Sequence, residues 1–128
     1  MEDRSPRVLI ADDNAALRRV IGFTFTGAGY EAVSVNDGAA ALEAAGLESF
    51  DLIVTDQQMP RMSGLELIER LRETPLNADT PVVLLTAKGL ELEFGPLRKR
   101  LGVAAMVAKP FSPTELTAVA DRLIAQPQ

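Results

Sequence analysis

The chain of 128 residues has 13 lysines and arginines, 18 aspartates and glutamates, a net charge of −5, and neither cysteine nor histidine. Its length fits one domain, its acidic balance disfavours direct nucleic-acid binding, and the missing residue types exclude disulfides, Cys- or His-ligated metals and Ser-His-Asp hydrolysis. Because no apolar run approaches the ~20 residues of a membrane span and the first residues form no signal peptide, we expect a cytoplasmic protein without membrane insertion.

The first apolar run, residues 8–11, predicts a strand that ends at Asp12-Asp13. Asn14 is a good N-cap for a helix that Gly27-Ala28-Gly29 ends. The spacing of its apolar residues predicts one buried stripe, formed by Leu17, Val20, Ile21 and Phe25.

The second strand is expected over residues 30–35 and the third over residues 50–55. Between them, Asp37 is a plausible cap for an alanine-rich helix over residues 38–46. The third strand runs directly into Asp56.

A helix is predicted to open at Ser63-Gly64 and to end before Pro75, because proline cannot continue the backbone ladder. Residues 81–85 form a continuous apolar run, typical of a strand covered on both faces, and it ends at Thr86. The next helix should lie within residues 88–102.

That helix contains Gly95-Pro96, which predicts a break or a late start. Residues 103–108 predict the fifth strand, which Lys109 follows. The last helix should start at Ser112, with serine as cap and proline in the first helical position.

Five strands alternating with helices predict one parallel sheet covered on both faces, in a single domain over 1–128 with its core at about 7–125. Ligands of such sheets bind at the carboxyl ends of the strands, so Asp12, Asp13, Asp56 and Lys109 should meet in one crevice. Three carboxylates this close repel one another unless a cation neutralises them, and Mg²⁺ prefers oxygen ligands.

Four motifs at the strand ends resemble those of the response-regulator receiver family, over essentially the whole chain. They are Asp12-Asp13, Asp56-Gln57-Gln58-Met59-Pro60, Thr86-Ala87 and Lys109-Pro110-Phe111. The resemblance implies a flavodoxin-like (βα)5 three-layer sandwich with strand order 2-1-3-4-5. It also implies a cis Lys109-Pro110 bond and a place in a two-component or phosphorelay system.

For the metal, the resemblance implies Mg²⁺ bound by Asp13, Asp56 and the backbone carbonyl of Gln58, with Asp12 acting through a water molecule. Asp56 would then be the phosphoacceptor, receiving its phosphoryl group from a phosphohistidine on a histidine kinase or a histidine phosphotransfer domain. The protein would be no enzyme beyond Mg²⁺-dependent self-phosphorylation from phosphodonors and slow self-dephosphorylation.

The resemblance further implies that Lys109 pairs with Asp56 and later with a phosphoryl oxygen. Thr86 would donate its hydroxyl to that group, and Ala87 would leave room for it. Family members usually carry Tyr or Phe where this chain has Met106, so a switch here must repack a methionine.

Three apolar residues stand at alternate positions between Lys88-Gly89 and Gly95-Pro96 and form a candidate partner patch: Leu90, Leu92 and Phe94. We expect signalling to a downstream protein target, with no DNA-binding or catalytic output domain in this chain. Two alternatives remain: a receiver-like interaction module that is never phosphorylated, and a haloacid-dehalogenase-like phosphatase. The phosphatase requires a second aspartate where this chain has Asn14.

Overall fold

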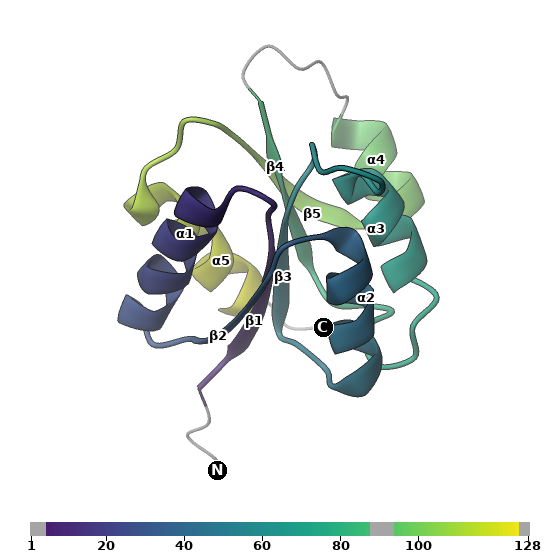
Figure 1. The fold of residues 1–128 in the computed structure, drawn as a ribbon, viewed down its shortest axis with the longest axis horizontal. Coiled ribbons are helices and arrows are strands. Elements are labelled where there is room, and N and C mark those ends of the chain that lie inside the picture. Colours follow the sequence, from purple (N-terminus) through teal and green to yellow (C-terminus); the bar gives the residue numbers. More distant parts are fainter. Residues whose placement is uncertain (1–4, 88–93, 126–128) are drawn as a thin grey trace.

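The computed structural model describes residues 5–87 and 94–125, which form five strands alternating with five helices (Figure 1). The strands are β1 (Arg7–Ala11), β2 (Glu31–Val35), β3 (Leu52–Asp56), β4 (Val82–Thr86) and β5 (Val103–Ala108). They pair in parallel in the order β2-β1-β3-β4-β5. The predicted flavodoxin-like α/β architecture and its strand order are therefore confirmed.

The helices are α1 (Ala15–Gly27), α2 (Gly38–Leu47), α3 (Gly64–Leu71), α4 (Phe94–Leu101) and α5 (Pro113–Ala125). Figure 1 shows α1 and α5 on one face of the sheet and α2, α3 and α4 on the other. Every residue of β3 and β4 is buried, as a sheet covered on both faces requires. Among the described residues, no helix has the length and hydropathy needed to cross a bilayer.

Side chains that alternate along each strand divide the core into two halves. Leu9 and Ile53 belong to the half under α2, α3 and α4, whereas Ile10 and Val54 belong to the half under α1 and α5. Each half holds the helices of one face against the sheet, so the strand ends that carry the polar residues are fixed from both sides.

The predicted helix caps are present. Asn14 Oδ1 accepts from the backbone N–H of Leu17 at 2.9 Å, and Asp37 Oδ1 accepts from that of Ala40 at 2.8 Å. Ser112 Oγ accepts from a first-turn N–H of α5 at 3.0 Å. The Gly95-Pro96 pair lies in the first turn of α4 as described, where proline is tolerated, so it does not interrupt the described helix.

The stripe predicted on α1 is wrong at one position. Ile21 and Phe25 are fully buried, but Val20 is 51% exposed. Consecutive helical residues point about 100° apart. Because Ile21 faces the sheet, the side chain before it points sideways into solvent.

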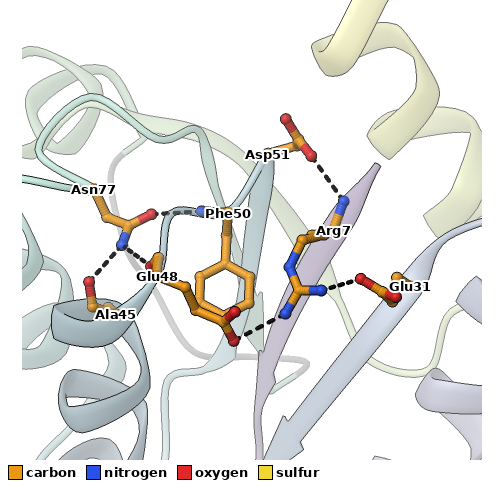
Figure 2. A network of polar contacts seen from close by, with 7 residues as sticks. All are labelled: Arg7, Glu31, Ala45, Glu48, Phe50, Asp51 and Asn77. Carbon is orange, nitrogen blue, oxygen red and sulfur yellow. Dashed lines mark hydrogen bonds and ion pairs between the residues drawn. The ribbon is translucent and has the colours of Figure 1, made fainter. Parts of the chain in front are cut away.

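A buried amide ties together three segments at the amino ends of the strands (Figure 2). Asn77, fully buried before β4, donates from Nδ2 to the carbonyls of Ala45 at 2.6 Å and Glu48 at 2.9 Å, at the end of α2. Its Oδ1 accepts from the backbone N–H of Phe50 at 2.9 Å, just before β3.

Arg7 extends this network at the start of β1 (Figure 2). Its guanidinium pairs with Glu31 of β2 and with Glu48 at 2.8 Å, and lies 5.6 Å from the ring centroid of Phe50. Its backbone N–H donates to Asp51 at 2.7 Å. Side-chain contacts therefore stabilise the amino ends of these strands, opposite the carboxyl ends where the predicted site lies.

Candidate functional site

The predicted site residues lie at the carboxyl ends of four strands. Asp12 and Asp13 follow β1, Asp56 ends β3, Thr86 ends β4 and Lys109 follows β5. The backbone N–H of Lys109 donates to the Thr86 carbonyl at 2.8 Å, which places the last two side by side. The topology thus gathers at one edge the residues that the sequence separates by almost a hundred positions.

Three carboxylates form a cluster at this edge. One carboxylate oxygen from each of Asp12, Asp13 and Asp56 lies within 4.8 Å of the other two. Asp12 and Asp56 are buried, whereas Asp13 is exposed. Like charges so close, two of them shielded from water, favour binding of a cation.

The environment of the Asp12 carboxylate favours a bound cation. Its Oδ1 accepts from the backbone N–H of Asn14 at 2.9 Å, but its buried Oδ2 has no hydrogen-bond partner among the described residues. Burial, opposed by the Asn14 bond and by the charge of Lys109, raises the pKa of Asp12, and the charges of Asp56 and Asp13 raise it further. An all-oxygen donor set with one unpartnered buried carboxylate oxygen fits Mg²⁺.

The Lys109 ammonium reaches Asp56 across the site. Its Nζ lies 2.9 Å from Asp56 Oδ1, and the Asp56 side chain is 7% exposed. The Lys109-Pro110 peptide bond is cis, as expected. Asp56 therefore belongs to the acidic cluster and also contacts a cationic side chain.

The loop after β3 lies close against the strand. Met59 is buried within it, and a Cβ added to Gly64 would lie 2.5 Å from the Asp56 carbonyl oxygen. Glycine is therefore the residue that allows α3 to start beside the end of β3. The side chain of Gln58 is exposed, and the ligand role of its carbonyl stays a prediction.

The predicted switch residues lie on the α4 side of the site. Ala87 follows the buried Thr86 and is half-buried, and Met106 packs against the core half under α2, α3 and α4. Leu90, Leu92 and the side chain of Phe94 lie outside the described residues.

Two contacts near the site were not predicted. Arg18 of α1 donates to the Asp12 carbonyl at 2.8 Å, and Gln57 Oε1 accepts from the backbone N–H of Leu65 in α3 at 2.9 Å. Both bonds join a side chain to a backbone group on another element. Spacing along the chain gives no signal for such bonds.

The fold and the site define an α/β protein with a cluster of carboxylates and a lysine at the carboxyl ends of a parallel sheet. The chain matches the response regulator receiver domain over residues 8–121, and it belongs to this family. The resemblance noted in the sequence is thereby confirmed.

Relatives of this chain include single domains and parts of longer proteins. It is 38% identical over 120 residues to the transcriptional activator protein PfeR of Pseudomonas aeruginosa, covering 94% of this chain and 38% of that protein. The structure of the chemotaxis response regulator CheY4 of Vibrio cholerae matches with a TM-score of 0.85 and 31% identity, covering 94% of this chain and 99% of the other. The chain spans less than half the length of the first curated relatives it matches.

A third relative bears on the metal. The receiver domain of the sensor histidine kinase PA1611 from Pseudomonas aeruginosa matches with a TM-score of 0.84 and 26% identity, covering 96% of this chain and 100% of the other. That structure has a magnesium ion coordinated in its active site cleft. The acidic cluster here lies in a fold of the same kind.

Proposed function

We propose that this domain accepts a phosphoryl group on Asp56 from a phosphohistidine of a partner histidine kinase or histidine phosphotransfer domain. The observation that carries the proposal is the 2.9 Å contact between Lys109 Nζ and Asp56 Oδ1 beside the cluster of three carboxylates. A carboxylate held between a cation site and a lysine is placed to act as a phosphoryl acceptor.

In the proposed reaction, a carboxylate oxygen of Asp56 forms a bond to phosphorus as the bond between phosphorus and the partner's imidazole nitrogen breaks. The imidazole leaves with the bonding electron pair, and Asp56 becomes an acyl phosphate. The donor histidine belongs to the partner, because this chain has none. Lys109 then pairs with a phosphoryl oxygen, and Thr86 donates its hydroxyl to another.

Mg²⁺ would be held by Asp13, Asp56 and the Gln58 carbonyl, with Asp12 acting through a water molecule. When bound, it supplies the positive charge that offsets the acceptor and phosphoryl oxygens. The unpartnered buried Oδ2 of Asp12 supports this assignment.

The surface beside Lys109 suits a docking partner. A groove of about 280 Å³ runs between α1 and the segment after β5, lined by Leu17, Val20, Pro110 and Phe111 among others. Val20 and Phe23 of α1 are 51% and 73% exposed. We propose that the phosphohistidine donor lies over this apolar surface, because it borders the lysine that contacts Asp56.

The output is proposed to leave from the opposite side of the site. Movement of Thr86 toward the phosphoryl group would let Met106 repack, and a downstream protein would read the change around α4 and β5. The patch of Leu90, Leu92 and Phe94 remains part of this proposal. Slow loss of the acyl phosphate would return the domain to its resting state.

Acetyl phosphate with Mg²⁺, followed by intact-mass spectrometry, tests the acceptor. The protein should gain one acid-labile phosphoryl group, and Asp56→Asn should gain none. Asp79→Asn, which changes an exposed aspartate away from the cluster, is the matched control and should be labelled like the parent. Labelling of Asp56→Asn would refute the site, and a parent that is never labelled would favour the interaction module instead.

A further inference from the structure

We infer that Gln57 is a positioning residue for the metal site: its side chain fixes the loop that carries the Gln58 carbonyl, without itself touching the metal. The inference rests on the proposed function, because it concerns the same Mg²⁺ site. It starts from the hydrogen bonds at the beginning of α3.

The first backbone N–H groups of a helix have no partner within the helix. In α3, the N–H of Gly64 donates to the Gln57 carbonyl and that of Leu65 donates to Gln57 Oε1, both at 2.9 Å. The N–H of Glu66 donates to Ser63 Oγ at 3.1 Å. Two of these three donors therefore depend on one residue outside the helix.

Gln57 is also bonded to the sheet. Its own N–H donates to the Leu85 carbonyl at 2.9 Å, which continues the pairing of β3 with β4 beyond Asp56. The residue thus joins the end of the central strand to the start of α3, and residues 58–63 form a loop closed at this junction. The Gln58 carbonyl lies one residue from the junction.

The far part of the loop is held separately. Arg61, at a φ of 69°, pairs with Asp37 at 3.3 Å, and Met62 packs so tightly against Gly38 that an added Cβ would lie 2.6 Å from its sulfur. These contacts fix the tip of the loop against the start of α2. Nearer to Asp56, the loop is held by the buried side chain of Met59 and by the Gln57 junction.

Mg²⁺ requires near-ideal octahedral geometry, with ligand distances of about 2.0–2.1 Å. A carbonyl ligand displaced by a few tenths of an ångström therefore binds it less well. Without the Gln57 side-chain oxygen, the N–H of Leu65 loses its acceptor, and of these two bonds only the one from Gly64 to the Gln57 carbonyl still joins the start of α3 to the end of β3. The orientation of the Gln58 carbonyl is then less well defined.

The test compares Gln57→Met, which keeps the length of the side chain but removes its acceptor, with Ser112→Ala. The second variant removes the same kind of bond at the start of α5, outside the metal ligands. Mg²⁺ affinity is measured by calorimetry and metal-free stability by urea unfolding. We expect both variants to lose similar stability, but only Gln57→Met to bind Mg²⁺ more weakly, by about tenfold.

A further variant, Gln57→Glu, keeps an oxygen acceptor at the same place and should bind Mg²⁺ at least as tightly as the parent. Equal Mg²⁺ affinity for Gln57→Met and Ser112→Ala would overturn the inference, as would weakened binding by Gln57→Glu. A parent protein that binds no Mg²⁺ would overturn the proposed metal site itself, and this inference with it.

Discussion

Asp12→Asn should stabilise the metal-free protein, although it alters a buried residue of the site. The two side chains have nearly the same shape, and the asparagine oxygen can still accept from the backbone N–H of Asn14. The substitution removes a negative charge from a fully buried side chain that lies beside two other carboxylates. One oxygen of that side chain has no hydrogen-bond partner among the described residues. Removing that charge relieves repulsion and desolvation together.

The magnitude follows from the spacing of the cluster. Two unit charges 4.8 Å apart repel by about 3.5 kcal/mol at an effective dielectric constant of about 20. That figure gives the scale of the repulsion between the buried pair Asp12 and Asp56, and the exposed Asp13 adds less because water screens it. Lost attraction to Lys109 offsets part of the gain. We expect a net stabilisation of about 1 to 2 kcal/mol, or about 5 °C in melting temperature.

The stability difference between the parent and Asp12→Asn should depend on pH. Burial raises the pKa of Asp12 above the ordinary value of 3.8, so the folded protein binds this proton more tightly than the unfolded chain. The stability that this proton contributes is fully present below that value and is lost as the pH rises through the folded pKa. Parent and Asp12→Asn should therefore be equally stable at the acidic end and diverge as the pH rises.

The assay is urea unfolding of both proteins from below pH 3.8 to neutral pH, first without metal and then with Mg²⁺. At free Mg²⁺ ten times its dissociation constant, the parent should gain about 1.4 kcal/mol, and the variant should gain less. Asp79→Asn serves as a control for removing an exposed charge. A metal-free Asp12→Asn protein that is less stable than the parent at neutral pH, or a difference that does not vary with pH, would refute the reasoning.

Two further predictions concern contacts remote from the site. Asn77→Ala should lower the free energy of unfolding by about 3 kcal/mol or more, because it leaves without a partner three backbone groups that now bond to the amide (Figure 2). Urea unfolding measures this change. A loss below about 1 kcal/mol would mean that these backbone groups find other hydrogen-bond partners in the variant. Tyr30 donates to Asp121 Oδ1 at 2.7 Å, and burial and that carboxylate raise the pKa of Tyr30. Because it is the chain's one tyrosine, its ionisation can be followed by absorbance, and it should ionise only well above pH 10 while the protein stays folded. Tyr30→Phe should cost about 1 kcal/mol, and an ordinary titration of the parent near pH 10 would contradict the proposed contact.

The parts of the site that lie at strand ends could be predicted from the sequence. An apolar run that stops at a charged residue marks both a strand and the edge where it ends, so Asp12, Asp56 and Lys109 could be placed together before any contact was known. Helix caps such as Asn14 and Asp37 act within a few residues, and their signals are equally local.

Contacts that depend on tertiary packing could not be predicted. Gln57 and Asn77 carry amides that bond to backbone groups of other elements, and nothing in their neighbouring residues identifies those partners. Val20 fits an apolar stripe by spacing alone, but the width of the buried face depends on how α1 rests on the sheet. The role of Gln58 depends on the direction of a backbone carbonyl, which no residue type encodes.

The placement of the first strand and the last helix has a practical consequence. β1 runs toward the site and α5 runs away from it, so the start of β1 and the end of α5 both lie remote from the carboxyl ends of the strands (Figure 1). A tether attached before β1 or after α5 therefore starts on the side of the molecule away from the acidic cluster. Immobilisation of the domain on a sensor surface through either end should leave Asp56 open to a phosphohistidine partner in solution.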